Sequence, residues 1–274
     1  MKFIYGKNVF LTGGSSGIGR STAELLAANG YIVFAGSRNP EANVQCFPSG
    51  GEIRPVTLDV RDPLSVGSAS EVVLAQADIG IVIHCAGIGI ACPGEEFDEE
   101  AVSGLMETNY TGVLRVNSHI LPHLRKRGSG LCLIVGSVGG VFPVPYQSHY
   151  CSSKAALDLY AASLRMELRD HRVRVCLIMP GDTNTAFTKA RTYVIDESSP
   201  FYESCLRAVQ KMEKDELTGR SPASAAHVIL KICNRNNPPR RIIVGIDYKL
   251  LALLGRLLPD RLIETIITKM YLEG

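Results

Sequence analysis

Tyr150 and Lys154 are four residues apart at the start of a long predicted helix. Side chains at this spacing share one face of a helix, so the phenol and the ammonium can reach the same cleft. A nearby cation favours the phenolate and lowers the pKa of a tyrosine from about 10 toward neutrality. Tyr150 could then donate a proton to a carbonyl or remove one from an alcohol. The spacing alone is weak evidence, because chance gives about half such a pair in a chain of this composition, and a surface pair is the alternative.

A serine at the end of an apolar run strengthens this interpretation. Ser137 follows the run at residues 131–135, whose continuous apolar pattern indicates a buried strand. Open α/β sheets bind their ligands at the carboxyl ends of parallel strands. The sequence therefore places Ser137 at the edge of the sheet where a substrate would bind.

The elements that must position these side chains alternate along the chain. Short apolar runs indicate strands covered on both faces, and longer helical segments lie between them. The seven predicted strands are 7–11, 31–35, 53–58, 79–84, 131–135, 172–178 and 241–244. The predicted helices are 17–29, 63–76, 109–127, 149–170, 201–214 and 223–234. This order predicts an α/β fold with a doubly wound, seven-stranded parallel sheet flanked by helices.

The chain is expected to form a single domain over residues 1–274, because no linker, repeat or low-complexity tract interrupts it. Residues 185–219 contain no predicted strand, so a substrate loop or lid at about 186–219 is expected, or a surface insertion. A C-terminal extension at about 248–274 has apolar positions near helical spacing, flanked by basic residues. Its apolar face is expected to pack on the core or on a second subunit, with peripheral membrane contact as the alternative.

A glycine-rich turn joins the first predicted strand directly to the first helix. Glycines let the backbone approach a diphosphate, and the helix N-terminus offers free N–H groups and a favourable dipole. This context favours a dinucleotide site of the Rossmann type over an ordinary strand–helix turn. The residues expected to bind the dinucleotide here are Gly13, Ser15, Ser16, Gly17, Ile18 and Gly19.

The end of the second predicted strand indicates which dinucleotide binds. An acidic residue there would hydrogen-bond the ribose hydroxyls and repel a 2′-phosphate. This chain has Ser37 and Arg38 instead, and the arginine can form a charge-assisted bond with the phosphate. NADP(H) is therefore favoured over NAD(H), with a solvated turn arginine as the alternative.

With these motifs in this order, the chain resembles the single-domain branch of the short-chain dehydrogenase/reductase family. The Thr-Gly-x-x-x-Gly-x-Gly turn, the strand-end serine and the Tyr-x-x-x-Lys pair support the resemblance over about residues 7–185. Segments at 127–130, 136–140 and 185–187 are most similar to hydroxysteroid dehydrogenase-like and retinol dehydrogenase-like members. The resemblance implies hydride transfer at a CH–OH or C=O group. It also implies a homodimer or homotetramer built through the helices at 109–127 and 149–170.

The resemblance assigns roles to the matching positions. Tyr150 would donate or accept the proton, Lys154 would lower its pKa and bind the nicotinamide ribose, and Ser137 would hydrogen-bond the substrate oxygen. Asn109 matches the asparagine that kinks its helix and holds a proton-relay water, with a polar helix-interior residue as the alternative. Tyr150 is expected to contact the cofactor as well. The remaining cofactor contacts would come from Asp59, Val60, Ala86, Gly87, Pro180, Gly181, Thr183 and Thr185. In the Pro-Gly-x-x-x-Thr turn at 180–185, Thr185 would contact the nicotinamide carboxamide.

One segment departs from the family pattern. Where Asn-Asn-Ala-Gly is usual, this chain has His84, Cys85, Ala86 and Gly87. The last two residues keep the close approach of backbone to cofactor, whereas side-chain hydrogen bonds that support the sheet are in doubt. His84 is interpreted as a structural residue and not as a catalyst.

Apolar residues near the expected cleft indicate the class of substrate. Val141, Phe142, Val144 and Phe187 favour a bulky apolar ketone or secondary alcohol, such as a steroid, a retinoid or a lipid-like molecule, unless they belong to the core. The alternative function is a catalytically silent NADP-binding sensor or scaffold on the same fold. A degraded catalytic group would mark such a protein, and here all four residues of that group are present.

Composition narrows the other possibilities. Charged residues make up 20% of the chain and the formal net charge is +2, without a basic tract, so no nucleic-acid partner is expected. Eight irregularly spaced cysteines form neither a zinc-binding pattern nor a disulfide framework, so no metal is expected. A secretory signal and a membrane-spanning stretch are not recognisable, and a cytoplasmic location is expected.

Overall fold

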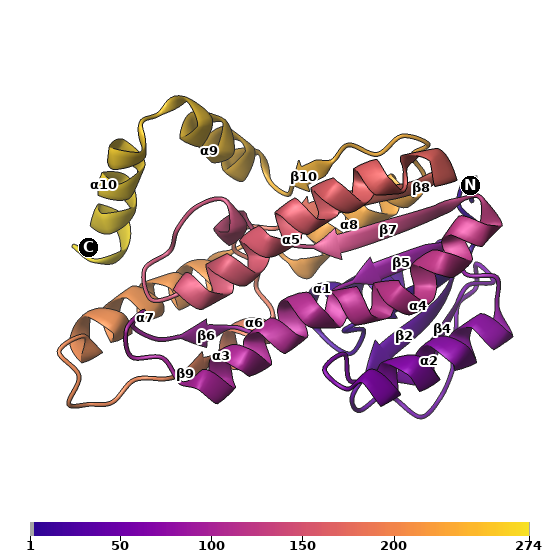
Figure 1. Cartoon of the computed structure of the whole chain (residues 1–274), viewed down its shortest axis with the longest axis horizontal. Coiled ribbons are helices and arrows are strands. Elements are labelled where there is room, and N and C mark those ends of the chain that lie inside the picture. Colours follow the sequence, from indigo (N-terminus) through magenta and orange to yellow (C-terminus); the bar gives the residue numbers. More distant parts are fainter. Residues whose placement is uncertain (1–2, 274) are drawn as a thin grey trace.

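The computed structural model describes residues 3–273 and joins the seven predicted strands in one sheet (Figure 1). These seven strands pair in parallel, in the order β10-β8-β7-β5-β1-β2-β4. Their bounds are β1 Asn8–Thr12, β2 Ile32–Ser37, β4 Glu52–Thr57, β5 Ile81–His84, β7 Gly130–Val135, β8 Val173–Met179 and β10 Arg241–Ile243. The order reverses between β1 and β5, and this switch point is where such sheets bind ligands. The predicted doubly wound fold is confirmed.

Two very short pairings extend the prediction. β3 (Gln45–Cys46) adds an eighth strand, antiparallel to β4, at the edge of the sheet. β6 (Ile90–Ala91) pairs in parallel with β9 (Thr192–Tyr193) in a separate two-stranded sheet. The expectation that residues 185–219 contain no strand is therefore wrong. A strand of two residues has no readable periodicity, because it exists only through pairing with a partner far away in the sequence.

Helices cover both faces of the sheet, which explains why its strands are apolar on both sides. α2 (Pro63–Gln76), α4 (Gly112–Arg127) and α5 (Ser148–Glu167) pack on one face. α1 (Gly17–Ala28) and α8 (Pro222–Cys233) pack on the other. Figure 1 shows α4 and α5 side by side along the sheet. The shorter or irregular elements are α3 Glu99–Met106, η1 Glu107–Thr111, η2 Val138–Gly140, η3 Arg169–His171, α6 Ala186–Lys189 and α7 Tyr202–Thr218.

Local sequence signals set the ends of the predicted helices. Asp62 accepts a hydrogen bond from the backbone nitrogen of Leu64 at 2.9 Å, and Pro63 occupies the first helical position, as expected for the start of α2. Gly30 follows α1 with a φ of +86°, a left-handed conformation that glycine adopts without strain. These capping residues fix where α1 ends and α2 begins.

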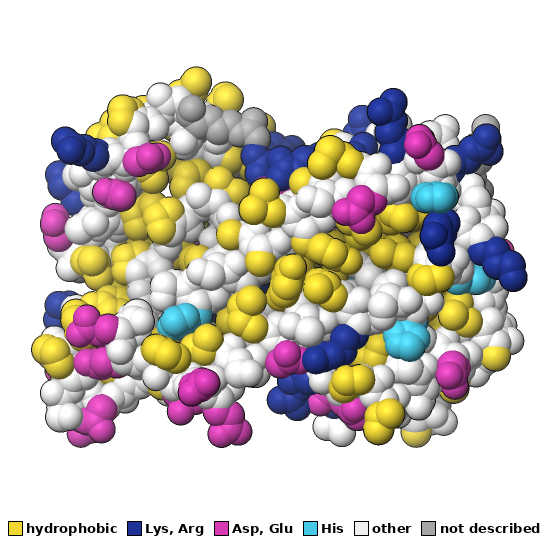
Figure 2. Space-filling model, viewed as in Figure 1, with side chains coloured by type: hydrophobic (Ala, Val, Ile, Leu, Met, Phe, Trp, Pro, Cys, Tyr) yellow, Lys and Arg dark blue, Asp and Glu magenta, His cyan; other side chains and the backbone are white. Residues whose placement is uncertain are grey.

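The C-terminal extension forms an arm of two helices, α9 (Ile246–Leu257) and α10 (Asp260–Tyr271), beside the main body (Figure 1). The apolar stripe of α9 faces solvent, and Ile246 and Leu257 are 73% and 72% exposed. Hydrophobic side chains are correspondingly visible on the arm in Figure 2. Packing of this stripe on the chain's own core, one of the two expected outcomes, is therefore wrong for α9. In the described part of the chain, no helix is both long and apolar enough to cross a membrane.

Candidate active site

The glycine-rich turn between β1 and α1 is closely packed against the end of β5. Gly13 and Gly17 have φ values of +73° and +53°, which favour glycine. A Cβ atom at Gly13 would lie 2.6 Å from the backbone nitrogen of Ala86, and one at Gly19 would lie 2.0 Å from the carbonyl oxygen of Gly13. No larger residue fits these two positions, so the turn has the tight geometry expected of a diphosphate site.

The first turn of α1 is available to an anion. Ser16 precedes the helix in an extended conformation, and its side chain makes no capping hydrogen bond. Ser15 and Ser16 are both exposed, whereas Gly19 is buried. N–H groups at an uncapped helix start bind phosphate readily, so this turn is suited to the diphosphate of a dinucleotide.

The residues expected at the adenine end lie at the ends of β2 and β4. Ser37 ends β2 and is buried, and Arg38 is exposed beside it. Asp59 accepts hydrogen bonds from Arg61 (Nη2 to Oδ2, 2.9 Å), which hold the pKa of that carboxyl below its usual range. Val60 packs against Gly112 at the start of α4, because a Cβ built on Gly112 would lie 2.8 Å from the Cβ of Val60. Asp59 is thus paired with Arg61. Arg38 takes part in none of the ion pairs found between the described residues.

His84 is a buried structural residue. Its Nε2 atom lies 2.9 Å from Oδ1 of Asn117, and Nδ2 of Asn117 donates to the hydroxyl of Tyr160 at 3.0 Å. Burial lowers the pKa of His84 to about 4, so the imidazole is neutral at physiological pH. These bonds link β5 to α4 and α5, and they supply part of the sheet support that the departure at residues 84–85 had put in doubt.

Asn109 lies at a break in the helix, as the resemblance implied. The helical run passes from α3 through a π-helical turn, η1, into α4, and π-turns of this kind often mark functional sites. The Asn109 side chain is fully buried. Its Nδ2 atom donates to the carbonyl oxygen of Ile88 (3.0 Å) and to Oγ of Ser153 (3.1 Å), and its Oδ1 accepts from the Ile88 nitrogen (2.8 Å). Asn109 therefore ties the segment after β5 to α5, and a role in holding a relay water stays a prediction.

Lys154 reaches the same place from α5. Its side chain is buried, and Nζ donates to the carbonyl oxygen of Val135 at 3.3 Å. A Cβ at Gly87 would lie 3.5 Å from this Nζ and 3.4 Å from Oδ1 of Asn109, so the glycine brings both polar groups close to the backbone. Burial lowers the pKa of Lys154 to about 8.

Tyr150 presents its ring to Lys154, with Nζ 5.6 Å from the ring centroid. Removal from water raises the pKa of Tyr150 above its ordinary value, and the polar contact with Ser137 only partly opposes this. The expected lowering of the Tyr150 pKa toward neutrality is not seen in this structure, because burial is the largest influence on that pKa. Tyr150 is thus a protonated phenol here, ready to donate a proton.

Ser137 lies next to Gly139, in the loop that follows β7. Its Oγ accepts from the Gly139 nitrogen at 3.1 Å and so caps the short helix η2. A Cβ at Gly139 would lie 3.4 Å from Oγ of Ser137 and 3.7 Å from Cε1 of Tyr150. The serine and tyrosine side chains therefore flank one glycine at the carboxyl end of β7.

The turn after β8, at residues 180–185, lies between the Ser137 loop and the glycine-rich turn. The Val138 nitrogen donates to the carbonyl oxygen of Pro180 at 3.0 Å, and Oγ1 of Thr183 donates to the carbonyl oxygen of Gly181 at 2.8 Å. Thr185 caps α6 and lies beside the glycine-rich turn, 3.3 Å from a Cβ built at Gly17. The residues at 180–185 therefore bridge the serine loop and the diphosphate turn.

Two residues of the segment predicted to form a substrate loop lie near Tyr150. The ring centroids of Phe187 and Tyr150 are 5.7 Å apart. Arg191 lies behind Phe187 with its side chain only 1% exposed, and it pairs with Glu213 (3.3 Å) and Glu216 (2.5 Å) of α7. Phe187 was predicted near the cleft, but Arg191 was not, because an arginine in an irregular loop gives no signal of burial.

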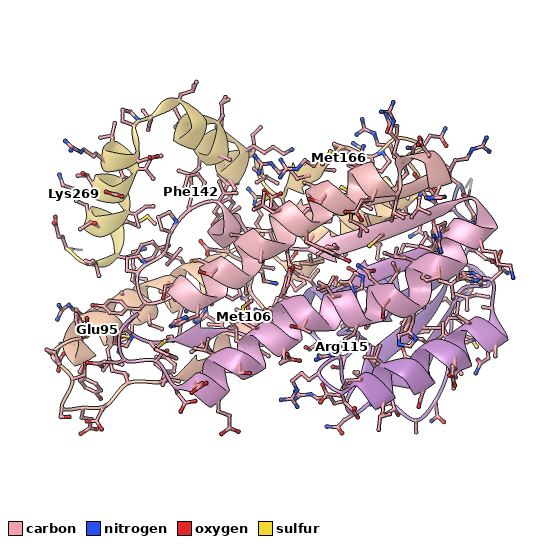
Figure 3. The ribbon with its side chains drawn as sticks, in the orientation of Figure 1. Glu95, Met106, Arg115, Phe142, Met166 and Lys269 are labelled. Carbon is pink, nitrogen blue, oxygen red and sulfur yellow. The ribbon has the colours of Figure 1, made fainter. Side chains whose placement is uncertain are left out.

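Two of the other predicted apolar residues contact the C-terminal arm. Phe142 contacts Gly255 of α9, where a Cβ would lie 2.5 Å from the Phe142 ring, and Figure 3 shows Phe142 close to this helix. Val144 packs with Tyr271 of α10 against buried residues of α7. Val141 is 39% exposed. Phe142 and Val144 therefore join the arm to the main body.

The fold and this site define the class of protein. A family profile described as short chain dehydrogenase matches residues 7–193, and the chain belongs to the short-chain dehydrogenase/reductase family. It is accordingly an oxidoreductase whose fold binds a nicotinamide cofactor.

Two relatives can be aligned with this protein over nearly its whole length. It is 35% identical to a 3-ketodihydrosphingosine reductase from Bacteroides thetaiotaomicron, over 96% of this chain and 97% of that protein. It is 30% identical to human 17-beta-hydroxysteroid dehydrogenase type 1, over 97% and 85%. Among solved structures, a short-chain dehydrogenase from Streptomyces avermitilis superposes with a TM-score of 0.80 at 26% identity, covering 96% of each chain.

Proposed function

We propose that this protein transfers hydride between NADP(H) and a bulky apolar ketone or secondary alcohol. The observation that supports this most directly is the meeting of Ser137, Tyr150 and Lys154 at the carboxyl ends of the strands, beside the glycine-rich turn. This is where open α/β sheets bind ligands. The reaction would be of the type that interconverts C=O and CH–OH.

Each side chain has a distinct task in the proposed reaction. The bound cofactor supplies hydride for reduction or accepts it during oxidation. Ser137 would donate a hydrogen bond to the substrate oxygen, and Tyr150 would give that oxygen a proton, because burial keeps its phenol protonated. Lys154 would bind the nicotinamide ribose, and its ammonium would stabilise the negative charge left on Tyr150 after proton transfer. Asn109 would hold the backbone after β5 in place for the cofactor.

The names of the relatives support the substrate class. One is named for the reduction of 3-ketodihydrosphingosine, a long-chain ketone, and the other for a hydroxysteroid. Both molecules present a carbonyl or hydroxyl group on a large apolar body. In this chain the ring of Phe187 lies against that of Tyr150, and Val144 and Tyr271 pack on the same buried residues. A long-chain or polycyclic ketone therefore suits the apolar ring beside Tyr150 better than a small polar one.

A substrate screen tests this proposal. Purified protein would be given NADPH and NADH in parallel with 3-ketodihydrosphingosine, a steroid ketone, retinal and simple ketones, and oxidation of the cofactor would be followed. We expect turnover of at least one bulky ketone, faster with NADPH. No turnover across the whole panel would reject the proposal, and turnover of small ketones alone would reject the substrate class.

Arg38 is expected to decide the preference for NADP(H). Arg38→Gln removes a charge-assisted bond to a 2′-phosphate, which contributes about 1.5–3 kcal/mol. The KM for NADPH should therefore rise about 10- to 100-fold while the KM for NADH stays nearly constant. Steady-state kinetics with both cofactors measure this, with Arg169→Gln, at an exposed arginine of η3, as the matched control. Equal effects on both cofactors would show that Arg38 does not read the 2′-phosphate.

We propose that the chain forms a homo-oligomer through α4 and α5. A surface groove of about 440 Å³ runs between these helices, lined in part by Leu114, Leu121 and Tyr160. On the outer side of α5, Leu159 and Met166 are 72% and 70% exposed, and Figure 3 shows Met166 at this face. An exposed apolar helix face of this kind marks an interaction surface.

A charge placed on this face should disrupt the oligomer. Met166→Glu would bury an unpaired carboxylate in the interface, so we expect association to weaken at least about tenfold. Sedimentation velocity over a range of concentrations measures the change. Leu64→Glu, on α2 and 81% exposed, is the control and should leave the oligomer intact. An unchanged sedimentation coefficient for Met166→Glu would place the interface elsewhere.

A further inference from the structure

Tyr248, in the first turn of α9, covers the turn that follows β8. The chain passes from β10 through Gly245, with a φ of +99°, directly into α9. The Tyr248 ring packs directly on Gly181. A Cβ built on Gly181 would lie 2.3 Å from Cε2 and from Cζ of that ring. Any larger residue at Gly181 would therefore displace Tyr248.

The Tyr248 hydroxyl makes two hydrogen bonds with Asp182, the residue that follows Gly181. It accepts from the Asp182 backbone nitrogen at 3.1 Å and donates to Oδ2 of the Asp182 carboxylate at 2.5 Å. Because one hydroxyl binds both the backbone and the side chain, it restrains the peptide orientation at Asp182 as well as the side-chain rotamer. Both residues are partly shielded from water, where such bonds are stronger.

Backbone groups of Arg220 also restrain this turn. The Asp182 carbonyl oxygen accepts from the Arg220 nitrogen at 3.0 Å, and the Asn184 nitrogen donates to the Arg220 carbonyl oxygen at 2.9 Å. Among the described residues, Tyr248 is the one side chain from outside the turn that hydrogen-bonds Gly181 or Asp182. Its restraint acts one residue before Thr183, an expected cofactor contact, and three before Thr185, the residue expected to contact the nicotinamide.

The arm itself has few other attachments near this point. Asp247 pairs with Arg220 at 2.7 Å, and both side chains are exposed, so this ion pair contributes little. Further along α9, Gly255 contacts Phe142, while the leucine stripe faces solvent. Tyr248 is thus the main polar link between the C-terminal arm and the active site.

We propose that Tyr248 is a positioning residue for the nicotinamide half of the cofactor. By holding Gly181 and Asp182, it sets the path of the turn toward Thr183 and Thr185, while the adenine half of the site is independent of it. This inference rests on the proposed role of residues 180–185 in binding nicotinamide. It links the position of α9 to the geometry of hydride transfer.

Tyr248→Phe tests the proposal, because it keeps the ring on Gly181 and removes only the hydroxyl. Binding of NADPH and of 2′,5′-ADP, which lacks the nicotinamide, would be measured by titration calorimetry. We expect the Kd for NADPH to rise about 5- to 20-fold, as for the loss of one or two hydrogen bonds, with the Kd for 2′,5′-ADP unchanged. With a ketone substrate, kcat should fall more than the KM for that ketone changes. The binding measurement needs no substrate, so a failed substrate screen would not be confused with failure of this inference.

Three further variants separate positioning from general damage. Asp182→Asn keeps an oxygen that accepts from Tyr248 and should bind NADPH within about threefold of the unmodified protein. Asp182→Ala combined with Tyr248→Phe should be no worse than Tyr248→Phe alone, because both changes remove the same contact. Tyr202→Phe, at the start of α7, is the matched tyrosine control. Equal weakening of NADPH and 2′,5′-ADP binding by Tyr248→Phe, or weakening of neither, would overturn the proposal.

Discussion

Tyr150→Phe is expected to lower kcat by at least about a thousandfold while leaving cofactor binding nearly intact. The variant keeps the ring that packs 5.7 Å from Phe187 and removes only the hydroxyl. General acid–base catalysis by a positioned group contributes about 10²- to 10⁴-fold, and the described site offers Tyr150 as the phenol beside Ser137. The loss should therefore appear in kcat and not in the Kd for NADPH.

Two measurements check this result. Oxidation of NADPH with the best ketone from the screen gives kcat, and fluorescence titration gives the Kd for NADPH. Tyr160→Phe is the matched control on the same helix, since its hydroxyl contacts Asn117 instead of the active site, and it should keep kcat within about threefold. Turnover of Tyr150→Phe at the level of the unmodified protein would remove Tyr150 from the chemistry.

Lys154→Met is expected to lower kcat about 10²- to 10³-fold and to weaken NADPH binding as well. Methionine fills a similar volume, but it cannot donate to the Val135 carbonyl oxygen or place a charge by the Tyr150 ring. The combined loss distinguishes this variant from Tyr150→Phe, whose cofactor binding should survive. Unchanged NADPH affinity would mean that Lys154 does not bind the nicotinamide ribose.

The pH dependence of stability separates this loss from unfolding. Burial lowers the pKa of Lys154 from 10.5 to about 8, so between these values the unfolded chain binds more protons than the folded one. The contribution of Lys154 to the free energy of unfolding should therefore rise with pH from about 8 to 10.5, because the cost of burying the ammonium is relieved. The buried cysteines, whose thiol pKa values are raised, act in the opposite direction in both proteins, so the effect is read as the difference between the unmodified protein and the variant. Lys154→Met lacks this rise and should be no less stable at neutral pH. Thermal melts across this range measure both effects, and a lower Tm for the variant at pH 7 would contradict them.

The catalytic activity should also depend on the protonation of Lys154. The pH profile of kcat/KM reports groups in the free enzyme, and in the free enzyme Lys154 loses its charge near pH 8. We expect kcat/KM for NADPH-dependent reduction to decline above about pH 8. A flat profile through this range would show that the ammonium is not required.

The sequence was sufficient to predict the parallel sheet, whereas the catalytic roles of its motif residues stay a prediction. Strands such as β7 and β8 are covered on both faces, so their apolar runs are readable without knowing the neighbours. The glycines at 13 and 19 are visible for a similar reason, because only glycine fits where a Cβ would meet backbone. The order of these motifs then led to the family, which the comparison of residues 7–193 confirmed.

Other features depended on contacts between distant parts of the chain. The strands β6 and β9 exist only because residues about a hundred positions apart pair with each other. Arg191 is buried only because two carboxylates of α7 neutralise it, and no local pattern records that. The periodicity of residues 248–270 predicted an amphipathic arm, but not that α9 turns its leucines outward.

Tyr150 and Lys154 show the same division most clearly. Their spacing on one helix was determined by the sequence, and so was the expectation of a shared cleft. The protonation of each group depends on how far it is buried, and in the tertiary structure burial raises the pKa of Tyr150 and lowers that of Lys154. The hydrogen bonds of Tyr248 with Asp182 likewise join residues 66 positions apart. The sequence by itself determined which side chains could react, and only the packing of distant segments decided their protonation and what holds them in place.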